Sequence, residues 1–261
     1  HSRAISQDKR LKNCLKIKPS DIEDFYRKYF IPSNIVIAFY TSTQPTALFN
    51  KIKKNFQNIP LRPSMNYPCY KYKFDNSNQI VYLKKNNHVS NLKIYYRIPY
   101  TFFDDEYYPI YALLKILGGD LNSLLFKKLR SEEGLIYDID ADMELDKVSK
   151  DLSFIEISTS MDSKNLIKVF KIILNILNDV KKDIPKQYIS KYKDSIKINK
   201  LQHEFCQNPR KLLIEYTDYT LWDKKLINVQ QEFKNFSNVN LNSLKKIDNI
   251  IFSNQNIHVC Y

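Results

Sequence analysis

Apolar and polar residues alternate along this chain with two periods, and each period predicts a type of element. Spacings of three and four residues are typical of amphipathic helices, whereas strict alternation is typical of half-buried strands. The helical spacing predicts helices over residues 20–30, 44–57, 104–117, 122–132, 163–182, 185–205, 209–223 and 241–251. Strand patterns cover residues 35–40, 80–83, 92–98, 135–143, 152–160 and 256–259.

Several of these elements carry further signals. Ser20 and Glu23 have the spacing of a capping box at the start of the first helix, and the apolar run 35–40 predicts a buried strand. The alternation over 92–98 predicts a strand in a sheet with one covered face. We therefore expect an α+β fold, with a mainly antiparallel sheet covered by helices on one face.

Residues 58–79 break all periodicity and contain three prolines, which predicts a linker. We expect a first domain over 1–58, a linker over 59–75 and a second domain over 76–261. The helix, Ser-Asn and apolar strand at the end of the chain repeat an arrangement near its beginning. Unless this match arose by chance, it predicts two homologous domains, the first truncated upstream of His1.

Glycine is scarce and concentrated in this sequence. Average usage of roughly 7% would give about eighteen glycines in a chain of this length. The chain has three, Gly118, Gly119 and Gly134. We expect Gly118 and Gly119 to end one helix in a left-handed cap, and Gly134 to end the next. Asp120, Asn122 or Ser123 would cap the helix between them.

Two residues of this segment have side chains suited to catalysis. Arg130 lies in the last turn of the second helix and Tyr137 in the strand that follows Gly134, so the turn brings them near each other. An Arg donor fork and a Tyr hydroxyl that point to one place could bind a peptide carbonyl or a developing oxyanion. The alternative is that Arg130 pairs with Glu133 or another surface acid, and that Tyr137 is a core aromatic.

Charge adds a second alternative for function. The chain has 41 Lys and Arg against 28 Asp and Glu, a net charge of +13. These bases are spread along the chain and are mostly lysine, so we interpret them as solvated surface and expect no nucleic-acid partner. The rival interpretation, a polyanion-binding protein, predicts affinity that falls steeply with salt.

The cysteines and histidines predict no metal site in this chain. Cys14, Cys69, Cys206 and Cys260 are far apart, which favours free thiols in a reducing compartment, either cytoplasm or an organelle matrix. His203 and Glu204 have no second ligand one helical turn away. No run of eighteen apolar residues occurs, so we expect no membrane span.

The segment from Ile116 to Tyr137 resembles the signature of the second domain of the pitrilysin/insulinase family, the inverzincin metallopeptidases that include mitochondrial processing peptidases. The family form is an apolar helix followed by L-G-G-G-x-x-S-x-L-F-x-x-L-R-x-x-x-G-L-A-Y. The positions in register are Gly118, Gly119, Ser123, Leu125, Phe126, Leu129, Arg130, Gly134, Leu135 and Tyr137. Residues 20–40 are similar, more loosely, to the end of the family's first domain.

The resemblance implies a role for each matching residue. Arg130 would contact the substrate backbone, and Tyr137 would help stabilise the tetrahedral intermediate. The family holds zinc on a His-x-x-Glu-His helix plus a downstream Glu, in the first domain. None of these ligands is in this sequence. This sequence departs from the family form at Asp120 in place of the third glycine, at Leu124 after Ser123, and at Ile136 in place of the small residue before the tyrosine.

We therefore expect the substrate-binding, non-zinc half of a zinc metalloendopeptidase that cleaves peptides in an enclosed chamber. Its partners would be a peptide substrate and a missing N-terminal domain or zinc-bearing subunit, and this segment alone would be inactive. The alternative from the same resemblance is a catalytically inactive core or scaffold subunit. The residues that precede His1 would distinguish the two.

Overall fold

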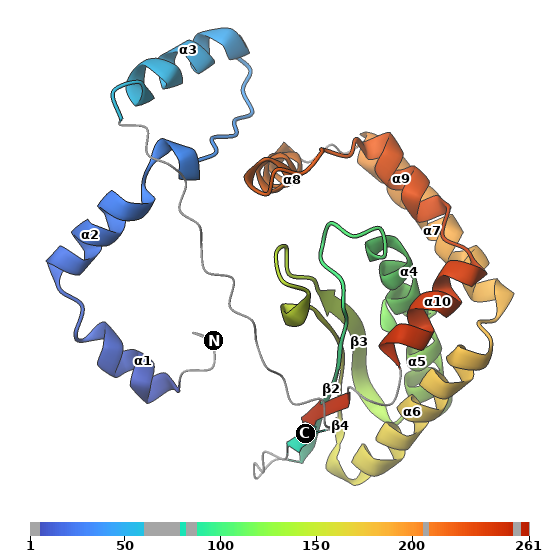
Figure 1. The fold of residues 1–261 in the computed structure, drawn as a ribbon. Helices are drawn as coiled ribbons and strands as arrows, with labels where there is room; N and C mark the ends of the chain where they lie inside the picture. Colours follow the sequence, from blue (N-terminus) through green and yellow to red (C-terminus); the bar gives the residue numbers. More distant parts are fainter. Residues whose placement is uncertain (1–5, 60–78, 82–87, 206–208, 253–256, 261) are drawn as a thin grey trace. The chain divides into compact units, whose positions relative to one another are not determined.

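The computed structural model describes residues 6–59, 79–81, 88–205, 209–252 and 257–260 (Figure 1). The chain divides into two compact units. The first comprises His1–Pro68 and Asn208–Leu226, and the second comprises Cys69–Gln207 and Ile227–Tyr261. Most of the expected linker lies outside the described residues.

All the regular elements in the described part of the first unit are helices. Its helices are α1 (Gln7–Cys14), α2 (Pro19–Tyr29), α3 (Pro45–Phe56) and α8 (Pro209–Leu221), with a 3-10 turn at Pro32–Asn34. The helix α2 begins one residue before the expected range. Its capping contact is a bond from the Lys18 backbone N–H to the Asp21 carboxylate (N···Oδ2 2.8 Å). The capping box predicted at Ser20 and Glu23 is therefore wrong, because Pro19 suits the first helical position and starts the helix earlier.

The buried strand predicted over residues 35–40 is not formed. These residues have no regular structure, and the side chains of Ile37 and Tyr40 are 44% and 73% exposed. A strand needs a neighbouring strand to pair its backbone N–H and C=O groups. The described residues of this unit form only helices, turns and irregular chain, so the apolar run has no strand to pair with.

The second unit is built on a five-stranded sheet with the order β1-β5-β2-β4-β3. Its strands are β1 (Gln79–Val81), β2 (Val89–Arg97), β3 (Ile136–Glu144), β4 (Phe154–Asp162) and β5 (Ile257–Cys260). The pair β1–β5 is parallel, and the remaining pairs are antiparallel. The mainly antiparallel sheet is thus confirmed.

Helices cover one face of this sheet (Figure 1). They are α4 (Tyr107–Gly118), α5 (Leu124–Phe126), α6 (Leu166–Lys182), α7 (Lys186–Phe205), α9 (Val229–Ser237) and α10 (Leu241–Ile251). The helix α4 packs on β3, and α6 packs on β2. None of the described helices combines the length and the apolar character that a membrane crossing requires.

The core lies between the helices and the covered face of the sheet. Alternate residues of β2 are buried, with Leu92, Ile94 and Tyr96 at most 2% exposed. The apolar face of α6 supplies Val169, Ile173, Leu177 and Val180 to the same cluster. Burying one such side chain contributes about 1.5–3 kcal/mol to stability. The shared core therefore holds α4 and β3 in their positions.

Candidate functional site

The end of α4 approaches β3 more closely than a side chain would allow. A Cβ atom on Gly118 would lie 2.9 Å from Ala141 Cβ and 3.1 Å from Ala141 N. Gly118 is therefore required for close helix–strand packing. Gly119 follows it with φ −83°, in the right-handed region. The left-handed cap expected at this pair is therefore wrong, since space rather than backbone sign selects glycine here.

The segment after the glycine pair forms a short helix with an irregular second half. Ser123 occupies the N-cap position of α5, but its buried hydroxyl makes no hydrogen bond within the described residues. Residues Lys127–Glu132 continue the helix with π-type geometry. Gly134 follows with φ +60°, a left-handed conformation that favours glycine. Such π-type turns are frequent at functional sites.

The side chain of Arg130 reaches from this turn to the start of β3. Its Nη1 donates to the carbonyl oxygen of Ile136 at 2.8 Å. That carbonyl belongs to the peptide group that joins Ile136 to Tyr137. The guanidinium has five N–H donors, so this bond leaves other donors free to bind a ligand. The structure therefore brings the arginine to the backbone of the tyrosine.

Tyr137 occupies a β-bulge. The register between β3 and β4 shifts between Ile136 and Asp138, so Tyr137 is the extra residue. Its side chain is 56% exposed. A bulge bends a strand and redirects a side chain, and bulges are frequent next to active sites. The core-aromatic alternative for Tyr137 does not hold, because its neighbour Ile136, 1% exposed, fills the core position instead.

The surface-pair alternative for Arg130 does not hold either. Glu133 is bound by two lysines, with Lys168 Nζ 2.9 Å and Lys128 Nζ 3.4 Å from its carboxylate oxygens. Hydrogen bonds from these two ammonium groups lower the pKa of Glu133. The Glu133 carboxylate therefore stays ionised and paired with the two lysines, while Arg130 binds the Ile136 carbonyl at the start of β3.

Sequence reasoning missed a row of acids on the same strand. Asp138, Asp140 and Asp142 are exposed, while the residues between them face the helices. The signal was visible as strict alternation over residues 138–144, but its meaning depends on the sheet order. This row begins directly after Tyr137, so acids extend along β3 from the arginine–tyrosine pair.

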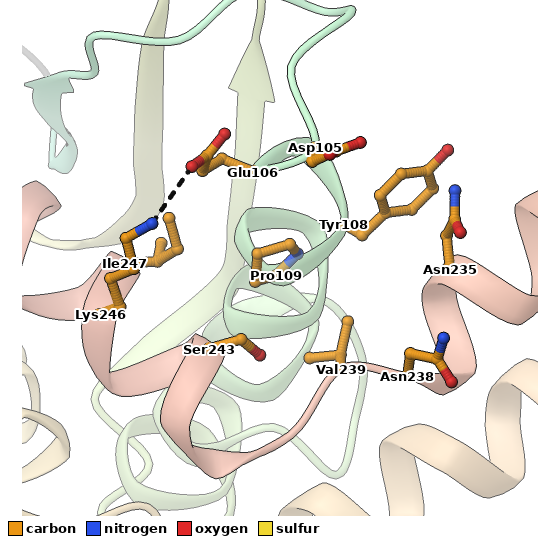
Figure 2. A pocket seen from close by; sticks show the side chains of 10 residues that line it. All are labelled: Asp105, Glu106, Tyr108, Pro109, Asn235, Asn238, Val239, Ser243, Lys246 and Ile247. Carbon is orange, nitrogen blue, oxygen red and sulfur yellow. Dashed lines mark hydrogen bonds and ion pairs between the residues drawn. The ribbon is translucent and has the colours of Figure 1, made fainter.

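A separate cavity of about 320 Å³ lies on the helical side of the unit (Figure 2). It opens between the start of α4 and the helices α9 and α10. Lys246 Nζ and Glu106 Oε1 are 3.4 Å apart at its rim, and burial raises the pKa of Tyr108 in its wall. Its rim lysine and carboxylate already pair, and the cavity contains neither Arg130 nor Tyr137.

No cluster of three or more metal-binding side chains occurs in the part of the chain that the structure describes. His203 belongs to α7, where its side chain lies outside the described set, as do Cys69, Cys206 and Cys260. The remaining cysteine of the four, Cys14, is an exposed free thiol.

Comparison with known proteins places this geometry in a family context. A family model described as the peptidase M16 inactive domain matches residues 16–196. A protease from Helicobacter pylori has 18% sequence identity and a TM-score of 0.78, over 94% of this chain and 59% of that one. No curated protein matches the chain.

Two further solved structures share the fold. The periplasmic protease PqqL from Escherichia coli has 14% identity and a TM-score of 0.74, over 94% of this chain and 28% of that one. Pitrilysin has 17% identity and a TM-score of 0.69, over 93% of this chain and 26% of that one. The chain thus spans less than two thirds of the length of each of these proteins.

Proposed function

Because the chain belongs to the M16 peptidase family, through the inactive domain of that family, we propose that it is the substrate-binding half of a zinc metalloendopeptidase. The catalytic zinc would be held by an N-terminal domain or a partner subunit, and the two halves would enclose a peptide in a chamber. In this arrangement the chain positions the peptide and stabilises charge, while the bond is broken at the other half.

The observation that carries the proposal is that Arg130 binds the peptide group that joins Ile136 to Tyr137. Arg130 donates to the Ile136 carbonyl, and Tyr137 projects from the bulge that follows. This contact fixes the guanidinium, and a fixed donor loses less conformational entropy when it binds a substrate carbonyl. Tyr137, 56% exposed, adds a phenolic hydroxyl as a second donor from the residue that follows Ile136.

Each group has a chemical role in this proposal. Zinc on the catalytic half would act as a Lewis acid and lower the pKa of a bound water. Arg130 would hold a backbone carbonyl of the peptide with its remaining N–H groups. Tyr137 would donate a hydrogen bond to the oxygen that becomes negative when the scissile carbonyl is attacked.

A second candidate function is that of a catalytically inactive scaffold subunit. One solved structure with this fold is described as complex III2 from Candida albicans, with 13% identity and a TM-score of 0.72. The two functions differ in whether the other half carries the zinc ligands. A His-x-x-Glu-His sequence in the preceding domain or the partner favours the peptidase, and its absence favours the scaffold.

Kinetics of the zinc-loaded enzyme test the peptidase proposal. Loss of one donor to a developing oxyanion lowers kcat by roughly 10²–10³-fold, so Tyr137→Phe should lower kcat/KM by about that factor. Arg130→Ala should lower kcat/KM mainly through KM, because its bond to the peptide backbone is made in the ground state. Zinc content should stay unchanged in both variants.

Controls separate catalysis from packing. Tyr40→Phe removes a hydroxyl from another exposed tyrosine, 73% exposed, and should leave kcat/KM unchanged. Thermal unfolding should show Tyr137→Phe to be as stable as the parent protein. Full activity of both the Arg130 and the Tyr137 variants would contradict the proposal and leave these residues with a packing role.

A further inference from the structure

The face of the sheet opposite the helices carries charged and polar side chains in register. The backbone pairing places Lys93, Ser158 and Asp140 in one row across β2, β4 and β3. The next row contains Tyr95, Glu156 and Asp142. A hollow of about 210 Å³ lies over this face, bordered by Asn91, Lys93, Asp138, Asp140, Ser158 and Ser160.

The strand β3 is an edge of the sheet. It pairs with β4 on one side, and within the described residues no strand pairs with its other side. An edge strand presents unpaired backbone N–H and C=O groups that can pair with an added strand. Three backbone groups of β3 have side-chain partners among the described contacts. Arg130 binds the Ile136 carbonyl, the Thr159 hydroxyl donates to the Asp138 carbonyl, and the Asp142 carboxylate accepts from the Met143 N–H. The rest of β3 could accept an extended peptide.

The acids of β3 differ in how far they are already occupied. Ser160 donates to the Asp138 carboxylate through both its backbone N–H and its hydroxyl. Asp142 accepts a bond from the neighbouring Met143 N–H. Asp140 lies between them, exposed, and has no hydrogen bond or ion pair among the described residues.

Lys93, the cation in the same row as Asp140, does not neutralise the aspartates of β3. Lys93 Nζ lies 2.7 Å from Glu156 Oε1, so that pair is internally balanced. Burial raises the pKa of Glu156, but the hydrogen bonds from Lys93 and Tyr95 together with the charge of Lys93 outweigh it, so the pKa is lowered and the carboxylate stays ionised. The three aspartates of β3 therefore leave this face locally acidic, although the whole chain has a net charge of +13.

We propose that β3 binds an extended basic peptide as an added strand, with Asp138, Asp140 and Asp142 selecting Lys or Arg at every second position. This inference rests on the proposed function, because it names the substrate class of the same site. Alternate side chains of a strand lie about 7 Å apart on one face, so the acids and the bases of the peptide would match one to one. The peptide would begin beside Tyr137.

The competing interpretation is that these acids only protect the edge. Charged residues on an edge strand prevent aggregation, and that role requires no ligand. The two interpretations differ in one respect. If the acids only protect the edge, the affinity for a peptide at low concentration should not depend on the charge of that peptide. If they recognise a ligand, binding should require a basic peptide and should depend on Asp140.

Fluorescence anisotropy with the full 261-residue chain provides the test. The probes are labelled nine-residue peptides with alternating Lys–Val or alternating Glu–Val. We expect the Lys–Val peptide to bind and the Glu–Val peptide to bind at least tenfold more weakly. Exposed charge pairs contribute about 0.2–1 kcal/mol each, so Asp140→Asn should raise Kd about two- to fivefold. The variant D138N/D140N/D142N should raise it about tenfold.

Two controls define the site. The matched variant D179N/D183N/D194N removes three charges from helices or their ends and should leave Kd unchanged, which excludes a general charge effect. A Lys–Val peptide with N-methyl groups on alternate amides keeps its charge but cannot pair along one edge, and it should lose binding. Equal affinity for the two peptides, or an unchanged Kd in D138N/D140N/D142N, would overturn the proposal in favour of edge protection.

The two proposals fail separately. Peptide binding by the chain is measured without zinc and without turnover, whereas the roles of Arg130 and Tyr137 are measured by kcat/KM. Selective binding at β3 with fully active Arg130 and Tyr137 variants would leave the peptide site and remove the catalytic roles. The reverse result would leave the catalytic pair and remove the basic specificity.

Discussion

Asp248 should make the stability of the second unit depend on pH in an unusual direction. This residue lies on α10, is 0% exposed, and neither carboxylate oxygen has a hydrogen-bond partner among the described residues. Burial raises the pKa of Asp248 from 3.8 to about 7, and the positive charge of Lys181 opposes the rise only in part. The folded protein therefore holds this proton more tightly than the unfolded chain.

The sign follows from proton linkage. Between pH 4 and 7 the folded state retains the Asp248 proton and the unfolded state has lost it, so stability falls as pH rises. The slope is about 1.4 kcal/mol per pH unit, because one proton separates the two states. From a pKa of 3.8 to one of about 7, the total loss comes to about 4 kcal/mol. The loss is complete above the folded pKa.

The substitution Asp248→Asn replaces the carboxyl group with an amide of nearly the same shape that cannot ionise. Near pH 4 both side chains are neutral in the folded state, so the two proteins should have nearly equal free energies of unfolding. At pH 8 the variant should be more stable by about 4 kcal/mol, or about 8–16 °C in Tm for a unit of this size. Urea unfolding followed by circular dichroism at each pH measures the difference.

The control is Asp194→Asn, which changes a residue whose side chain is 61% exposed in an i,i+3 pair with Lys197. Its free energy of unfolding should differ from that of the parent protein by no more than about 1 kcal/mol. If Asp248→Asn and the parent protein differed by the same amount at pH 4 and pH 8, the reasoning would be refuted. That result would show that the buried carboxylate has a partner that keeps it ionised.

The glycines give two further predictions. Gly118→Ala should destabilise the protein by about 1–3 kcal/mol, because the added Cβ would contact Ala141. Ala141→Gly in the same molecule should restore part of the lost stability. A double-mutant cycle that shows no coupling between the two substitutions would contradict this contact. Gly134→Ala should lower the free energy of unfolding by about 1–2 kcal/mol. The loss would come from the φ of +60° alone, because a Cβ at this position meets no atom within 4 Å. An unchanged urea midpoint would contradict this prediction and show that the turn relaxes.

Much of the second unit could be predicted from sequence because burial sorts its side chains by period. The stripe of α6 and the alternation of β2 both come from packing against one shared core. The neighbours of each strand could not be predicted in this way. The segments 79–81 and 257–260 lie far apart in sequence, yet they pair in parallel, and no periodicity encodes that pairing.

The predictions that were wrong concern features that depend on a neighbour. The run 35–40 has the composition of a strand, but composition does not supply a pairing strand. The left-handed cap at Gly118 and Gly119 was inferred from backbone freedom, whereas Gly118 is required by the position of Ala141 on another element. The contact from Arg130 to the Ile136 carbonyl depends on the π-type turn and the bulge, which have no side-chain signature.

Three local irregularities of the backbone lie close together in sequence, between residues 127 and 138. The π-type turn, the left-handed Gly134 and the bulge at Tyr137 each cost stability relative to regular structure. They persist because Leu129 and Ile136, at most 1% exposed, hold both ends of the segment in the core. Within this segment Arg130 binds the Ile136 carbonyl, next to the bulged Tyr137. Irregularities of these kinds are frequent at functional sites, which agrees with the ligand-binding role that we propose for Arg130 and Tyr137.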